Sequence, residues 1–160
     1  KKKNKKNIKK KNRIDANQNS KKKKQLKKEK LEKNKYEVVD YGTNSSDSVD
    51  YPDYGKKVAQ AVIDNEVEKG IVCCGTGIGI SIAANKVKGI RCAHVSDTFS
   101  AKMSRAHNNC QMIALGERVL GAGLALEIVD AFLNTEFEGD RHQRRVDKIM
   151  DIEGGFTCQN

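Results

Sequence analysis

The sequence predicts an α/β fold in which helices cover both faces of a parallel sheet. Strand-like and helix-like segments alternate from residue 36 onward, with short connections between them. A length of 160 residues suits one domain with a substantial core. A short apolar run at 71–73 leads into a glycine-rich turn and then into a helix-like pattern. Because parallel sheets bind ligands at the carboxyl ends of their strands, this turn is the first candidate for a site.

The strands are predicted from short apolar or alternating runs. The first clear run covers 36–41 and ends at Gly42. The run 71–73 is apolar throughout, as expected for a strand that is buried on both faces. Two further runs, at 90–95 and 111–115, complete this part of the sheet.

The helices are predicted from apolar residues that recur every three or four positions. Asp97, after Ser96, is a suitable N-cap for one of them, and the last helix is expected over 141–150. The apolar positions of the other helices are Tyr54, Val58, Ala61 and Val62; Ile82, Ala83 and Val87; Phe99 and Met103; and Leu124, Ile128, Ala131 and Phe132.

The charge is divided unevenly along the chain. Residues 1–35 carry 18 Lys or Arg and 3 acidic residues, while residues 36–160 carry 13 and 18. A segment of lysine and asparagine with few apolar residues is typical of a solvated arm, and it could bind polyanions. It has no aromatic residue for base stacking, so a nucleic-acid partner is not expected. The remaining body is mildly acidic.

The cysteines and the hydropathy predict a cytoplasmic protein. The five cysteines have neither CxxC nor metal-ligand spacing, and an odd number does not suit a disulfide framework. The sequence therefore predicts reduced thiols and no metal site. No apolar run reaches membrane-spanning length, and the N-terminus lacks the apolar core of a signal peptide.

Cys74 stands where an anion-binding turn begins. The glycine turn, residues 75–79, places backbone N–H groups at the start of a helix, where they and the helix dipole stabilise an anion. The same position favours the thiolate form of a cysteine. The turn is neither a dinucleotide fingerprint, because Ile80 stands where that motif has its last glycine, nor a P-loop. Two simpler interpretations stay open: Cys74 is a buried structural residue, and the glycines only permit a tight turn.

Three other residues, His107, Arg141 and Arg145, suggest that the protein binds and converts a phosphorylated substrate. His107 follows a helix in a polar loop and could act as an acid or base, although a plain surface histidine is the alternative. Arg141 and Arg145 share one face of the last helix and could hold a phosphate; a solvated basic face is the alternative. His94 lies within a predicted strand and is expected to be a hydrogen-bonded core residue.

Five motifs in order resemble the ribose-5-phosphate isomerase B family, part of a group that includes the galactose-6-phosphate isomerase subunits. The similarity covers about residues 36–152. The motifs are Tyr36-Glu-Val-Val-Asp-Tyr-Gly, Asp50-Tyr-Pro, Cys74-Gly-Thr-Gly-Ile-Gly-Ile-Ser-Ile-Ala-Ala-Asn-Lys, Ser104-Arg-Ala-His-Asn-Asn and Glu138-Gly-Asp-Arg-His-Gln-Arg-Arg-Val. The resemblance implies a Rossmann-like three-layer α/β/α sandwich with a parallel sheet of about five strands. It also implies a homodimer or homotetramer with shared active sites, a phosphorylated pentose as substrate, and no cofactor.

The resemblance assigns the chemistry to the glycine turn. Cys74 would be the base that moves a proton between C1 and C2 of the open-chain sugar, interconverting ribose 5-phosphate and ribulose 5-phosphate. Thr76 would help to position it. The turn's backbone amides would stabilise the enediolate oxygen. The residues that supply these amides are Gly75, Gly77, Ile78 and Gly79.

The resemblance assigns substrate binding to other segments. His107 would assist opening of the furanose ring, and Asn108 would hold a sugar oxygen. Arg141 and Arg145 would hold the 5-phosphate, and Tyr51 would line the pocket.

The N-terminal segment departs from the family pattern. Asn17 stands where the family has a sugar-binding Asp, Gln18 where it has a His, and Ser20 where it has a turn glycine. The preceding strand would be 12–14, which is poor material for a buried strand. An amide can still hydrogen-bond but cannot act as a carboxylate, so this departure makes an impaired enzyme the alternative to a fully active one.

The predicted organisation and function follow from these observations. Residues 1–35 would form a Lys/Asn-rich segment with a divergent first strand and helix, 36–152 an isomerase-like domain, and 153–160 a tail. The main hypothesis is an active ribose-5-phosphate isomerase. Two alternatives are a catalytically impaired homologue that binds sugar phosphates, and a polyanion binder that acts through residues 1–35.

Overall fold

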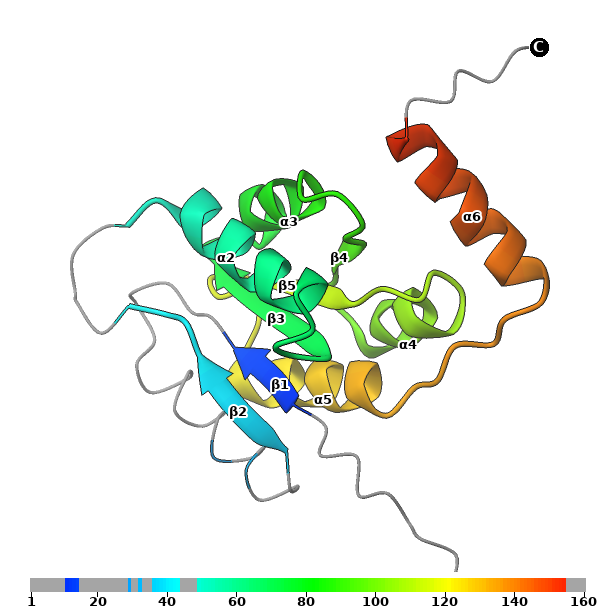
Figure 1. Cartoon of the computed structure of the whole chain (residues 1–160). Helices are drawn as coiled ribbons and strands as arrows, with labels where there is room; N and C mark the ends of the chain where they lie inside the picture. Colours follow the sequence, from blue (N-terminus) through cyan, green and yellow to red (C-terminus); the bar gives the residue numbers. More distant parts are fainter. Residues whose placement is uncertain (1–10, 15–28, 30–31, 33–35, 44–48, 155–160) are drawn as a thin grey trace, which may run out of the picture.

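A five-stranded parallel sheet is the centre of the computed structural model, which describes residues 11–14, 29, 32, 36–43 and 49–154 (Figure 1). The strand order is β2-β1-β3-β5-β4. The strands are β1 (Lys11–Ile14), β2 (Glu37–Asp40), β3 (Lys69–Cys74), β4 (Cys92–His94) and β5 (Met112–Gly116). The predicted parallel sheet of about five strands is therefore confirmed.

Helices cover both faces of this sheet, as predicted (Figure 1). Those that the structure describes beyond single residues are α2 (Tyr51–Ile63), α3 (Ile78–Asn85), α4 (Thr98–Ala106), α5 (Ala122–Leu133) and α6 (Arg141–Glu153). One apolar cluster joins α4 and α5 to the sheet, and a second joins α2 and α3 to the opposite face. Figure 1 shows α6 projecting away from the sheet.

Successive residues of β3 point alternately into the two clusters. Ile71 and Cys73 belong to the cluster under α4 and α5, whereas Val72 and Cys74 belong to the cluster under α2 and α3. All four side chains are buried. The two adjacent cysteines therefore face opposite layers, because side chains alternate across a strand. Cys74 is the last residue of β3, and its Cα pairs with that of Gly116 at the end of β5.

Several sequence predictions differ from the structure in detail. The helix after the glycine turn ends at Asn85, so Val87 lies beyond it, and Ile82 is exposed because α3 packs through other positions. His94 is hydrogen-bonded, to the Thr76 carbonyl, but it is not a core residue: it is exposed at the end of the edge strand β4. The last helix continues to Glu153 instead of ending at 150.

The N-terminal prediction is tested only in part. The predicted strand at 12–14 exists as β1, and it lies between β2 and β3 in the sheet. Of the predicted first helix the structure describes only Glu29 and Glu32, which are helical and exposed. Among the described helices, none is long and apolar enough to cross a membrane.

Candidate active site

The glycine turn lies at the carboxyl end of β3 and adopts a conformation that needs glycine. Gly77 is the N-cap of α3 and has φ of 82°, in the left-handed region that residues with a Cβ rarely adopt. A Cβ there would lie 2.8 Å from the backbone carbon of Leu115 and 2.9 Å from the Gly116 nitrogen. The turn is therefore packed directly against the end of β5. The first-turn amides of α3 have no acceptor within their own helix and can serve an anion.

The thiol of Cys74 is held by this turn. The backbone N–H of Gly77 donates to its Sγ at 3.1 Å, and the side chain is buried. The Thr76 hydroxyl accepts from the Ile78 amide at 3.3 Å. The structure thus brings together Cys74, Thr76 and the amides of the turn as the sequence predicted.

Three side chains border the turn from neighbouring elements. Tyr51, at the start of α2, lies so close to Gly79 that a Cβ on this glycine would meet the phenol ring at 2.6 Å. The guanidinium of Arg118 lies over Gly75, about 3.5 Å from where a Cβ would be. His94 Nε2 is 2.9 Å from the Thr76 carbonyl oxygen. Tyr51, which was predicted to line the pocket, borders the glycine turn.

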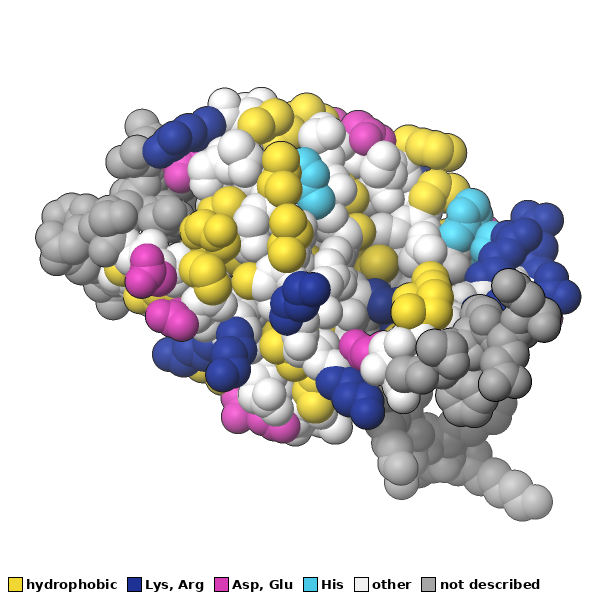
Figure 2. Space-filling model, turned by 90° about the horizontal axis from the view of Figure 1, so that it is seen from above, with side chains coloured by type: hydrophobic (Ala, Val, Ile, Leu, Met, Phe, Trp, Pro, Cys, Tyr) yellow, Lys and Arg dark blue, Asp and Glu magenta, His cyan; other side chains and the backbone are white. Residues whose placement is uncertain are grey.

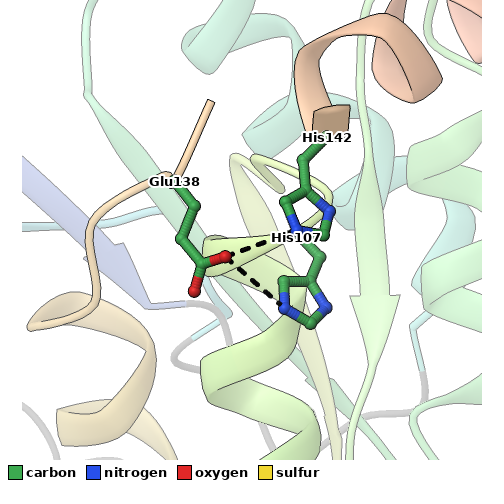
Figure 3. A group of neighbouring side chains, drawn as sticks. All are labelled: His107, Glu138 and His142. Carbon is green, nitrogen blue, oxygen red and sulfur yellow. Dashed lines mark ion pairs between the residues drawn. The ribbon is translucent and has the colours of Figure 1, made fainter. Parts of the chain in front are cut away.

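His107 belongs to a second group of polar side chains (Figure 3). It is the C-cap of α4, and its ring stacks on that of His142, with 4.2 Å between ring centroids and 2° between ring planes. Glu138 Oε2 lies 3.3 Å from His142 Nε2 and 3.8 Å from His107 Nε2. Burial lowers the pKa of His142, and the neighbouring His107 and Arg141 lower it further, against the opposite effect of Glu138.

The predicted arginine pair is on the same side of the molecule as His107. Arg141 and Arg145 are exposed residues of α6, and Arg141 Nε lies 3.4 Å from His142 Nε2. The last turn of α6 contacts the connection before β4, where the Gly89 amide donates to a Glu153 carboxylate oxygen at 2.8 Å. Asn108 is exposed next to His107. These four predicted residues therefore form one group.

The Cys74 turn and the His107 group lie at opposite ends of the parallel strands, the turn at the carboxyl ends and His107 near the amino ends. Cys74 is level with the end of β5, whereas the Asn108 carbonyl accepts from the side chain of Arg91, just before the start of β4. The five residues of β5 span about 13 Å at 3.3 Å per residue. Acid–base catalysis needs contacts of about 3 Å. Within one chain, Cys74 and His107 are therefore too far apart to act on neighbouring atoms of one sugar.

Two predicted residues cannot be placed. Asn17 and Gln18 follow β1 in the sequence and lie outside the described residues. Sequence reasoning did not place four residues that border the two groups. Arg118 and His94 reach the glycine turn, and Glu138 and His142 surround His107. The spacing of Glu138 and His142, four apart at the start of a helix, was a signal that they could pair.

The His107 group does not have the geometry of a metal site. The nearest ligand atoms of His107, Glu138 and His142 all lie within 4.8 Å of one another. However, the two imidazole rings are parallel and stacked, so an ion in the plane of one ring would lie well outside the plane of the other. The observed arrangement suits hydrogen bonding and stacking.

Comparison with known proteins identifies the family to which the chain belongs. The family model described as Ribose/Galactose Isomerase matches residues 14–149. The chain belongs to this family. Ribose-5-phosphate isomerase B of Escherichia coli is 54% identical over 117 residues, which are 73% of this chain and 79% of that protein. The match includes the glycine turn and the His107 group.

Solved structures of the Ribose/Galactose Isomerase family share the fold. A ribose-5-phosphate isomerase B of Clostridium thermocellum superposes with a TM-score of 0.87 at 51% identity, covering 92% of this chain and 99% of that one. The ribose-5-phosphate isomerase B of Mycoplasma genitalium, solved with bound ribulose-5-phosphate, superposes with a TM-score of 0.86 at 38% identity. The superposition covers 91% of this chain and 97% of that one. The Rossmann-like sandwich that the resemblance implied is thus confirmed.

Proposed function

We propose that this protein interconverts ribose 5-phosphate and ribulose 5-phosphate, with Cys74 as the base. The observation that carries the proposal is Cys74 itself, fixed at the end of β3 by the Gly77 amide in a chain of the Ribose/Galactose Isomerase family. A cysteine acts as a base in its thiolate form. The turn supplies a backbone N–H donor, that of Gly77, 3.1 Å from the Cys74 sulfur. The same turn can stabilise a second charge on the substrate.

The proposed reaction moves hydrogen within the sugar and requires no other reactant. Cys74 takes the proton from C2 of the open-chain aldose, and the electron pair passes to the carbonyl oxygen to give an enediolate. Amides of the glycine turn stabilise this oxygen as its charge develops. Return of the proton to C1 and transfer of a hydroxyl proton complete the ketose. His107 would assist ring opening before these steps, with Asn108 on a sugar oxygen and the arginine pair on the phosphate.

The distance between the two groups supports an active site shared by two copies of the chain. Because the two ends of β5 are about 13 Å apart, the His107 group of a second copy would have to meet the Cys74 turn of the first. Apolar side chains gather on the face that Figure 2 shows, which carries α3. Exposed surface of this kind marks interaction sites. Ile78 and Ile82 of α3 are each more than half exposed.

One observation favours a second candidate, a homologue with impaired catalysis. Asn17 and Gln18 replace the Asp and His that the family resemblance places after the first strand. An amide can still donate and accept hydrogen bonds to a sugar, but it cannot serve as a carboxylate. Such a protein would bind the sugar phosphate and convert it slowly.

One assay separates these candidates. Formation of ribulose 5-phosphate is measured for the full chain and for the Asn17→Asp/Gln18→His variant at equal concentration. The proposal expects turnover by the full chain and a faster variant. Turnover by the variant alone would identify an impaired homologue. If neither protein forms ketose while both remain folded, the proposed function is wrong.

We also propose a cytoplasmic location. Within the described part of the chain, cysteines 73, 74, 92 and 110 are buried thiols that form no disulfide. Free thiols are the usual state in reducing compartments. Fractionation of the native host cells, with the protein followed by antibody, tests this location, and recovery outside the cytoplasm would contradict it.

A further inference from the structure

The backbone around Glu138 is built to hold two imidazole rings together. The Glu138 amide donates to the carbonyl oxygen of Ala106 at 3.0 Å, which ties the segment before α6 to the end of α4. Gly139 and Asp140 then turn with positive φ, of 72° and 46°. The His142 amide donates to the Gly139 carbonyl at 2.9 Å. This turn places His142 directly over His107.

The side-chain contacts fix the plane of the His107 ring. Parallel rings with centroids 4.2 Å apart leave His107 little freedom to tilt toward His142. One carboxylate oxygen of Glu138 lies 3.3 Å from His142 Nε2 and 3.8 Å from His107 Nε2 (Figure 3). The carboxylate therefore faces the same edge of both rings, and it can compensate a positive charge on either.

The charges around the pair favour a neutral His142. Burial lowers its pKa first, and the charges of His107, Arg141 and Arg145 add to this effect, while Glu138 opposes it. These groups come from the end of α4, the segment before α6, and α6 itself. His107 is half-buried whereas His142 is only 5% exposed, so His107 is the ring that a sugar can reach.

We propose that His142 and Glu138 are positioning residues for His107, holding its ring in the plane and at the place where it serves ring opening. His142 acts by stacking as a flat, neutral ring, and Glu138 acts by compensating the charge of His107 while it holds a proton. Neither residue needs to touch the sugar. This inference rests on the proposed isomerase function of His107.

Replacement of His142 distinguishes positioning from a structural role. A displacement of about 1 Å at a reacting group can cost up to about 100-fold in rate, so His142→Ala is expected to lower kcat about 10- to 100-fold. His142→Phe keeps a flat ring and is expected to recover most of this loss. Glu138→Gln keeps the shape of Glu138 but removes its charge, so it is expected to move the acidic limb of the pH–kcat profile. Gln143→Ala, on the same helix, is the matched control, because the Gln143 side chain donates to the Asp147 carboxylate.

The Michaelis constant identifies any damage to α6 itself. Arg141 flanks His142, so a distorted helix would weaken phosphate binding and raise KM, as well as the inhibition constant for inorganic phosphate. The proposal expects both constants to stay near the wild-type values while kcat falls. A raised KM with unchanged kcat, or a Phe variant as slow as the Ala variant, would overturn it.

A spectroscopic measurement tests the geometry without any turnover. Stacking on His142 shifts the NMR resonances of the His107 ring protons through its ring current. This shift is expected to disappear in His142→Ala and to persist in His142→Phe. If the shift is lost in both variants, or absent in the wild type, the positioning role is wrong. Absence of ketose from a wild-type protein that shows the shift would instead refute the proposed function.

Discussion

Gly77→Ala is the substitution that tests the glycine turn most severely. A residue with a Cβ held at φ of 82° costs about 1–2 kcal/mol. The new methyl group would also meet backbone atoms of Leu115 and Gly116 at 2.8 and 2.9 Å, which are too close for a real Cβ. Overpacking of this kind typically costs about 1–3 kcal/mol. The free energy of unfolding is therefore expected to fall by about 2–5 kcal/mol.

Denaturant unfolding, at one fixed protein concentration, measures this loss. The matched control is Gly123→Ala in α5, where a Cβ would meet nothing within 4 Å. Alanine is the better helix former by about 1 kcal/mol, so this control should be neutral or slightly stabilising. Ordinary surface substitutions change the free energy of unfolding by up to about 0.5 kcal/mol. If Gly77→Ala differs from the wild type by no more than that, the turn does not require glycine and this prediction is wrong.

Three other expectations follow from the same structure. Arg141→Met should raise KM for the sugar phosphate through a lost charge-assisted contact, with Lys148→Met on the same helix as the control; equal KM values would exclude the phosphate role. Because the pKa of His142 is lowered in the folded state, the unfolded chain takes up protons first as pH falls below about 6.5. Wild-type stability should therefore fall between pH 7 and 5 more than that of His142→Phe, and parallel curves would contradict this. Burial raises the pKa of Cys110 to about 11 and that of Cys92 still further, so neither thiol should react with iodoacetamide at pH 8 before unfolding, as mass spectrometry can check.

The parts of the fold that the sequence revealed are those set by local pattern. The apolar run 71–73 predicts a strand buried on both faces, and β3 is such a strand, with Cys73 and Cys74 in opposite clusters. Asp97 was predicted to cap α4, and its carboxylate accepts from the Ser100 amide at 2.7 Å. Both features depend on neighbours in the chain, so the sequence is sufficient to find them.

The parts that the sequence did not reveal depend on contacts between distant segments. His107 and His142 are 35 positions apart, and nothing in either motif indicates that their rings stack. The approach of Arg118 to Gly75 depends on how the connection after β5 folds back over the turn. His94 was misplaced because a strand pattern does not show whether the strand lies at the edge of the sheet.

Solvent deuterium incorporation tests the central claim, that Cys74 is the base of the reaction. In D₂O the wild-type protein should place deuterium on the carbon next to the carbonyl group of the sugar phosphate, as NMR can follow. Cys74→Ala should lose this exchange about 100- to 10,000-fold, the usual contribution of one acid–base group. Cys73→Ala, on the opposite face of the same strand, should keep it. Exchange at the wild-type rate in Cys74→Ala would contradict the account.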